Sequence, residues 1–117
     1  MQVLLWERRA GKTTACVEYL NNHPDTICFV PALHYKDTYP EELHDRVFSA
    51  NSITWRGVPF LAAIIDEANH IKDSTLDNIM SCFDIKMITL TPLSVIEKAI
   101  FAYGFNRKLE GDNPANV

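Results

Sequence analysis

The sequence has no long apolar run and no excess of positive charge. None of its apolar stretches approaches the ~20 residues that a membrane-spanning helix needs, so we expect no membrane partner. The first residues also lack the charged-then-apolar order of a secretory signal peptide. Eleven basic side chains stand against 15 acidic ones, which argues against a surface that binds nucleic acid by bulk electrostatics. A local basic patch remains, because Arg8, Arg9 and Lys12 cluster.

Cysteine is scarce as well. Cys16, Cys28 and Cys82 are odd in number, lie far apart and lack the spacing of a metal site. We interpret them as reduced, buried thiols, as in a cytoplasmic protein. The expected location is therefore the cytoplasm, or the host cytoplasm if the protein is viral. No internal repeat or low-complexity segment is found, and 117 residues suffice for one core.

Glycine is missing from one position where a motif would require it. Residues 3–6 predict a buried strand, residues 7–14 a polar turn, and residues 13–22 a helix. This layout is typical of a phosphate-binding loop, in which glycine allows close approach and successive N–H groups offer positive charge. The pattern G-x-x-x-x-G-K-[ST] is matched from Gly11 to Thr13, but Trp6 replaces its first glycine. The residues expected to bind phosphate are Arg9, Ala10, Gly11, Lys12, Thr13 and Thr14.

Strand and helix patterns alternate along the rest of the chain. Strands are predicted over residues 26–30, 60–65 and 86–90, with a short strand or edge ribbon over residues 52–55. Ser74 with Asp77 and Ser94 with Glu97 resemble capping boxes of helices that extend over residues 74–83 and 95–103. Pro40 begins a helical turn, from which Leu43 and Val47 would face the core.

This alternation predicts an α/β fold, a three-layer sandwich with a mainly parallel, doubly wound sheet. We expect one domain over residues 1–105 and a polar tail over residues 106–117. In such sheets ligands bind at the carboxyl ends of the strands. Residues 7–14, 66–70 and 89–92 all follow predicted strands, so we expect them to meet in one crevice.

The side chains at these strand ends match the requirements of nucleoside triphosphate hydrolysis. Lys12 would contact the phosphates, and Thr13 and Asp66 would hold Mg²⁺, which prefers oxygen ligands. Glu67 would polarise the attacking water, and Thr91 would sense the γ-phosphate. Adjacent acids at a strand end point in different directions, so separate roles for Asp66 and Glu67 are physically sensible. His70 is open to two interpretations, a reader of the nucleotide state or a surface histidine.

Four motifs in order resemble the ATPase domain of phage terminase large subunits, DNA-packaging motors of the ASCE class of P-loop ATPases. They are Arg8 to Thr13, Asn51-Ser52-Ile53 with Arg56-Gly57, Ile64 to Ala68, and Thr89 to Pro92. Several terminases carry R-x-x-G-K-[ST], which Arg8 matches. The resemblance covers residues 2–105 and implies a minimal P-loop NTPase with ATP and Mg²⁺ as cofactors. It implies Lys12 and Thr13 as Walker A, Asp66 and Glu67 as Walker B with the catalytic glutamate, and residues 89–92 as the coupling motif.

The same resemblance bears on charge and on partners. A single core without a partner domain would lack an arginine supplied from outside, so activity would depend on positive charge from Arg8 or on assembly. DNA, a partner protein or further copies of the chain would complete a motor. The segment between the two Walker motifs is shorter than usual in that family, and after Ile100 we expect no further ATPase strands and no nuclease domain.

Two other interpretations stay open. A nucleoside kinase of the thymidine kinase type also pairs a P-loop with an Asp-Glu-Ala strand end, although its zinc-binding cysteine set is absent here. A non-catalytic interaction protein could retain the P-loop fold as a scaffold, with Trp6 as a sign of lost function.

Overall fold

A five-stranded parallel sheet forms the centre of the computed structural model, which describes residues 1–5, 11–52, 55, 57 and 61–91. The strands are β1 (Gln2–Leu5), β2 (Thr26–Val30), β3 (Val47–Ser49), β4 (Ala62–Ile65) and β5 (Asp84–Leu90). Their order is β1-β5-β4-β2-β3, and every pairing is parallel. The prediction of an α/β fold built on a parallel sheet is confirmed.

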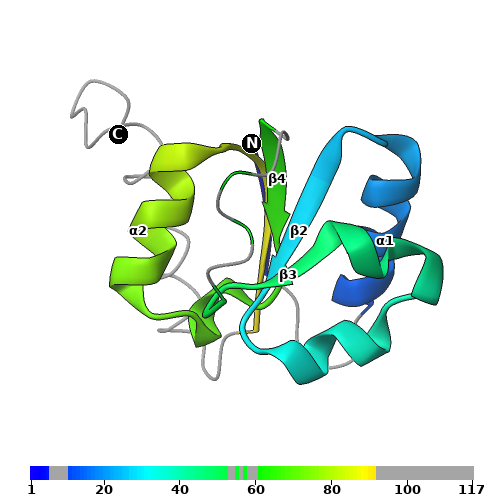
Figure 1. Cartoon of the computed structure of the whole chain (residues 1–117), viewed down its shortest axis with the longest axis horizontal. Coiled ribbons are helices and arrows are strands. Elements are labelled where there is room, and N and C mark those ends of the chain that lie inside the picture. Colours follow the sequence, from blue (N-terminus) through cyan, green and yellow to red (C-terminus); the bar gives the residue numbers. More distant parts are fainter. Residues whose placement is uncertain (6–10, 53–54, 56, 58–60, 92–117) are drawn as a thin grey trace.

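Helices α1 (Lys12–Asn22) and α2 (Asp73–Cys82) lie on opposite faces of this sheet (Figure 1). The path from β1 through α1 to β2 runs toward the β3 edge, whereas the path from β4 through α2 to β5 runs back toward β1. Because such crossovers are right-handed, opposite directions place the two helices on opposite faces. The carboxyl ends of β1, β4 and β5 therefore lie at the same edge of the sheet, next to the point where the two paths set off in opposite directions.

Short 3-10 helices complete the described chain. They are η1 (Leu33–Thr38), η2 (Glu41–Arg46) and η4 (Ala68–His70). Tyr39, between η1 and η2, and Leu43 in η2 are buried in the same cluster as Cys16 and Leu20 of α1. The two 3-10 helices therefore extend the layer that α1 begins.

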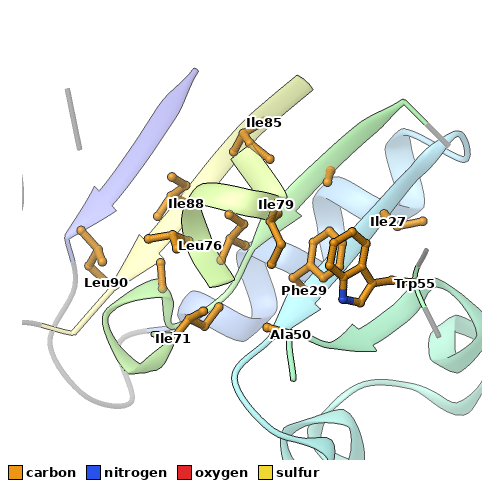
Figure 2. Close-up of a cluster of buried hydrophobic side chains, with 13 residues drawn as sticks. Ile27, Phe29, Ala50, Trp55, Ile71, Leu76, Ile79, Ile85, Ile88 and Leu90 are labelled. Atoms are coloured by element: carbon orange, nitrogen blue, oxygen red, sulfur yellow. The ribbon is translucent and has the colours of Figure 1, made fainter. Parts of the chain in front are cut away.

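Two apolar clusters fill the space on either side of the sheet. On the α2 side, Leu76 and Ile79 pack with Phe29 (Figure 2) and with other alternate strand residues such as Ile65. On the α1 side, the intervening residues Cys28 and Ile64 take part. All five residues of β2 are buried, because that strand is covered on both faces. This explains its continuous apolar and β-branched sequence.

A bulge in β5 lets this strand contribute side chains to both clusters. Ala63 pairs with Ile85 but Ile64 pairs with Met87, so Lys86 is the extra residue. Its side chain is exposed and pairs with Asp84. Ile85 consequently faces the α2 cluster and Met87 the α1 cluster.

Several predicted elements are confirmed. The strand over residues 26–30 is found with those bounds, the first helix begins one residue earlier than predicted, and β5 begins two residues earlier. The helical turn after Pro40 is the 3-10 helix η2. Trp55, interpreted as a packing residue, is buried with its ring 5.4 Å from that of Phe29.

Three predictions are wrong. α2 begins at Asp73 with Lys72 as its N-cap, so Ser74 lies inside the first turn and is not the N-cap; the Asp73 carboxylate already favours a helix start there. Val47 is buried in the core as predicted, but it lies in strand β3 and not on a helix. Cys82 is exposed at the end of α2, because the buried stripe of that helix contains Leu76 and Ile79. Trp6, residues 53–54 and 58–60, the helix expected over residues 95–103 and the polar tail lie outside the described residues.

Candidate functional site

The first turn of α1 begins at a glycine in a conformation that other residues rarely adopt. Gly11 is the N-cap, with φ 87° and ψ 21° in the left-handed region. Its carbonyl accepts the first helical hydrogen bond from the N–H of Ala15 at 2.9 Å. A Cβ at this position would be strained, which explains the glycine. Lys12 and Thr13 follow as the first helical residues, and the Lys12 side chain is only 5% exposed.

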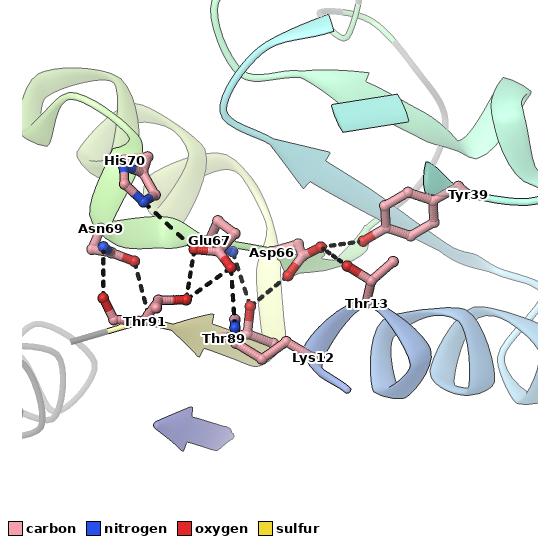
Figure 3. A network of polar contacts seen from close by, with 9 residues as sticks. All are labelled: Lys12, Thr13, Tyr39, Asp66, Glu67, Asn69, His70, Thr89 and Thr91. Atoms are coloured by element: carbon pink, nitrogen blue, oxygen red, sulfur yellow. Dashed lines mark hydrogen bonds and ion pairs between the residues drawn. The ribbon is translucent and has the colours of Figure 1, made fainter. Parts of the chain in front are cut away.

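Asp66 is the centre of a buried polar network that joins four segments of the chain (Figure 3). It directly follows β4, and its N–H continues the strand pairing by donating to the carbonyl of Phe29 at 2.9 Å. Its side chain is buried at 1% exposure. Oδ1 accepts a 2.6 Å hydrogen bond from the hydroxyl of Thr89. Oδ2 accepts one from Tyr39 at 2.7 Å and a longer one from Thr13 at 3.3 Å.

The Glu67 side chain points away from that of Asp66 because of its backbone. Its φ of 56° and ψ of 48° are left-handed, an unusual conformation for a residue with a side chain. The strain is of the order of 1–3 kcal/mol, and such residues gather at functional sites. The N–H of Glu67 donates to Oγ1 of Thr89 at 2.9 Å, which holds the turn in place.

The Glu67 carboxylate lies beside the lysine and the histidine of the site. Nζ of Lys12 lies 3.3 Å from Oε1, and Nε2 of His70 lies 3.6 Å from Oε2. The hydroxyl of Thr91 lies 2.8 and 2.9 Å from the two carboxylate oxygens. Thus Asp66 is surrounded by neutral hydroxyls, whereas Glu67 is paired with an ammonium. Two adjacent acids occupy chemically different surroundings.

Asn69 fixes the end of β5 against the loop after β4. Its amide nitrogen donates to the carbonyl of Thr91 at 3.3 Å, and its amide oxygen accepts the Thr91 N–H at 3.2 Å. This two-point contact aims the Thr91 hydroxyl at Glu67. The orientation of Glu67 therefore depends on both strands.

Burial keeps the groups behind Asp66 uncharged. Burial away from water is the main reason that the pKa of the Tyr39 hydroxyl is raised far above its usual range, and the electrostatic effect of the nearby Cys28 is the second. A side-chain hydrogen bond with Cys28, together with burial, does the same for the pKa of the Cys16 thiol. Tyr39 is therefore a neutral hydrogen-bond donor to Asp66 at physiological pH.

Comparison of the chain with protein-family models, with curated proteins and with solved structures returns no match. Function must be argued from this geometry. Among the described residues, no helix is both long and apolar enough to span a bilayer. That same part of the chain contains no group of three or more His, Cys, Asp or Glu side chains able to hold a metal ion.

The donor set between α1 and β4 nevertheless fits Mg²⁺ bound together with a phosphate ligand. Oγ1 of Thr13 and Oδ2 of Asp66 are hard oxygen donors that lie 3.3 Å apart. Mg²⁺ in proteins commonly uses one or two such groups, with waters and substrate phosphates completing its shell. A site with few protein ligands is therefore compatible with this cation.

The structure brings most of the predicted site residues together. Five of them belong to one network: Lys12, Thr13, Asp66, Glu67 and Thr91 (Figure 3). Thr14 is exposed on α1. Arg8, Arg9 and Ala10 lie outside the described residues, as does Ile53 of the second motif.

Two members of the network, Tyr39 and Asn69, were not expected as side chains with a role, and Thr89 was named only as part of the coupling motif over residues 89–92. A signal existed for Thr89, because a hydroxyl inside an apolar strand must find a partner when it is buried. Asn69 follows the acidic pair closely, and an amide there could have been considered. Tyr39 lies in a polar loop between two 3-10 helices, where the sequence offers no periodicity that would mark it.

Proposed function

We propose that this protein binds ATP with Mg²⁺ through a P-loop and hydrolyses it, as a minimal relative of terminase or helicase-like motors. The observation that supports this most directly is the ion pair between Lys12 and Glu67. It places Lys12, at the start of α1, beside the acid that follows β4, with the left-handed Gly11 one residue away. A phosphate ligand would draw the Lys12 ammonium away and leave the Glu67 carboxylate available as a base.

Phosphate binding would change the partner of Lys12. An anionic phosphate offers charge-assisted hydrogen bonds to the ammonium, and the N–H groups at the start of α1 offer further donors. Once Lys12 has moved to the phosphates, Glu67 keeps its hydrogen bond from Thr91. The carboxylate is then oriented but no longer neutralised, which suits it to accept a hydrogen bond from water.

We propose that hydrolysis uses this arrangement in the following way. A water oxygen forms a bond to the γ-phosphorus as the bond from that phosphorus to the bridging oxygen breaks, and Glu67 accepts the water proton. Thr13 and Asp66 would hold Mg²⁺, which when bound neutralises charge on the phosphate oxygens. The Thr13 hydroxyl can use its oxygen toward the cation while its proton remains directed at Asp66.

The first test is nucleotide binding. Lys12→Ala should weaken the binding of a fluorescent ATP analogue by about 10- to 100-fold, because charge-assisted contacts to phosphate are lost. Lys72→Ala is the matched control, since Lys72 is an exposed lysine at the start of α2. If wild type and Lys12→Ala bind the analogue equally, the P-loop proposal fails.

A second test concerns the polymer. ATP hydrolysis is measured alone and with single-stranded or duplex DNA, and the mass of the protein is measured with and without nucleotide. We expect slow hydrolysis that DNA or self-association increases, since a motor acts on a polymer. Phosphate transfer to a nucleoside in the same assay would instead favour the kinase alternative.

A non-catalytic scaffold is the other candidate, and one observation favours it. The network satisfies its own hydrogen bonds, with each carboxylate already partnered inside the chain. Such a network stabilises a fold without any ligand. Nucleotide binding without hydrolysis, or no binding at all, would support that candidate.

A further inference from the structure

Tyr39 reaches the candidate cation site from a part of the chain that carries no recognised motif. It lies between η1 and η2, 27 positions before Asp66, and its hydroxyl donates to Oδ2 of Asp66 at 2.7 Å. That oxygen is also the one nearest to Thr13. We propose that Tyr39 is a positioning residue that holds Asp66 in the orientation required for the divalent cation. The inference rests on the proposed function and adds a residue to it.

The backbone of Tyr39 leaves its side chain little freedom. Its N–H donates to the carbonyl of Lys36 at 3.0 Å, and its own carbonyl lies 3.0 Å from Nε2 of His44. Pro40 follows and restricts the conformation of the residue before it. The ring is 4% exposed within the α1 cluster, and Sγ of Cys28 lies 3.4 Å from its hydroxyl. The hydroxyl is therefore fixed relative to the sheet.

A fixed hydroxyl determines how Asp66 can turn. Thr89 holds Oδ1 and Tyr39 holds Oδ2, so the plane of the carboxylate is pinned at both oxygens. The Thr13 hydrogen bond to Oδ2 then keeps the carboxylate facing the Thr13 oxygen, beside which a cation or its waters would lie. Groups that orient a metal-binding carboxylate in this way typically change metal affinity by about 10- to 100-fold.

The chemical nature of Tyr39 also suits this role. A neutral donor orients Asp66 and leaves its negative charge available to a divalent cation. A lysine or arginine at the same place would neutralise Asp66 and repel the metal. Lys12, the nearby cation of the loop, is paired with Glu67 instead. The site thus separates its positive side chain from the acid that faces the metal.

The test compares nucleotide binding with Mg²⁺ and in the presence of a chelator. The variant is Tyr39→Phe, which removes the hydroxyl and keeps the ring in the core. The probe is a fluorescent, non-hydrolysable ATP analogue, so that binding is read without turnover. In the presence of the chelator, we expect Tyr39→Phe to bind the analogue within about twofold of wild type. The increase in affinity that Mg²⁺ causes should be about tenfold smaller than in wild type. Tyr35→Phe is the control, because Tyr35 is a half-buried tyrosine of the same loop.

A double-mutant cycle shows whether Tyr39 acts through Asp66. Asp66→Asn should itself remove most of the Mg²⁺-dependent gain, and adding Tyr39→Phe to it should cause no further loss. Thermal unfolding of each variant identifies any that fail to fold.

The outcomes separate the two proposals. If wild type shows the gain with Mg²⁺ and Tyr39→Phe retains it, the inference about Tyr39 is overturned and the proposed function stands. An equal loss of affinity with and without metal would also overturn it, since that is the effect of a purely structural residue. If wild type binds no nucleotide under either condition, both proposals fail together.

Discussion

The two ends of the sheet are held by different kinds of hydrogen bond. At the carboxyl end, Asp66 and Glu67 are held mainly by other side chains, namely hydroxyls and an ammonium. At the amino end, the guanidinium of Arg46 donates to backbone carbonyls of Leu20, His23 and Thr26 at 2.6–3.0 Å. It thereby ties the end of α1 and the start of β2 to η2.

This difference separates function from stability. Side-chain partners can be exchanged for a ligand by rotating bonds, so the carboxyl end can respond to phosphate without unfolding. Backbone carbonyls cannot be redirected unless the chain itself moves. Substitutions at the carboxyl end should therefore change ligand chemistry, and those at the amino end should change the free energy of unfolding.

The largest expected effect is on turnover in Glu67→Gln. Glutamine keeps the shape of the side chain and its contact with Thr91 but cannot accept a proton. We expect hydrolysis to fall by about 10²- to 10⁴-fold. Nucleotide binding should be retained or tighter, because Lys12 no longer leaves an ion pair to reach the phosphates. Phosphate release and analogue binding are measured side by side.

Glu18→Gln is the control for that substitution, since Glu18 is an exposed acid on α1. Unchanged turnover in Glu67→Gln would contradict the role of Glu67 as the acceptor of the water proton and would make Asp66 the next residue to test.

At the amino end, Arg46→Ala should lower the free energy of unfolding by about 2–3 kcal/mol, because charge-assisted hydrogen bonds to partly buried carbonyls are lost. Arg46→Lys should recover only part of this, since an ammonium lacks the planar fork that reaches several carbonyls at once. Urea denaturation gives the free energies. Nucleotide affinity, measured under conditions where the variants are folded, should match wild type; a change at the site would show that the two ends are coupled.

The same contrast explains what the sequence could predict. Strand β2 was predictable to the residue, because a run of apolar and β-branched residues bounded by Asp25 and Pro31 suits a strand buried on both faces. Lys12, Thr13, Asp66 and Glu67 were predictable because strand ends in a parallel sheet meet at one edge. These inferences need only local pattern and topology.

The partners that cross between loops could not be predicted. Tyr39 and Arg46 act through contacts that depend on the path of the chain between β2 and β3, and no periodicity encodes that path. Val47 was placed on a helix because its spacing from Leu43 fits a helical turn, yet η2 ends at Arg46 and the next residue joins the sheet. Tertiary pairing outweighed the local pattern there.

Thr89 tests whether the carboxyl end also contributes to stability. Thr89→Val keeps the volume and removes the hydroxyl that serves Asp66 and the N–H of Glu67. Leaving these groups without that partner should lower the free energy of unfolding by about 1–2 kcal/mol, since Asp66 retains Tyr39 and Thr13. Thr89→Ser should restore most of the loss. If Thr89→Val leaves the free energy of unfolding unchanged in urea denaturation, the network around Asp66 does not stabilise the fold, and Arg46 alone carries the effect that we infer for both ends.

The smallest effect is expected at the cysteines, and it reports on the α1 face beside Tyr39. Cys82 is exposed, whereas Cys16 and Cys28 are fully buried. The thiolate is the reactive form, and the raised pKa of Cys16 keeps that thiol protonated as the pH rises. A thiol reagent should therefore modify one cysteine rapidly at pH 7 to 9, and Cys82→Ser should remove that phase while leaving nucleotide binding unchanged. Cys16 and Cys28 should react only as fast as the fold opens. Both should react more slowly when ATP is bound, because a ligand that binds the folded state lowers the population of the open state. Rapid modification of a second cysteine in the native protein would show that the α1 face opens locally, and would remove the fixed frame on which the position of Tyr39 depends.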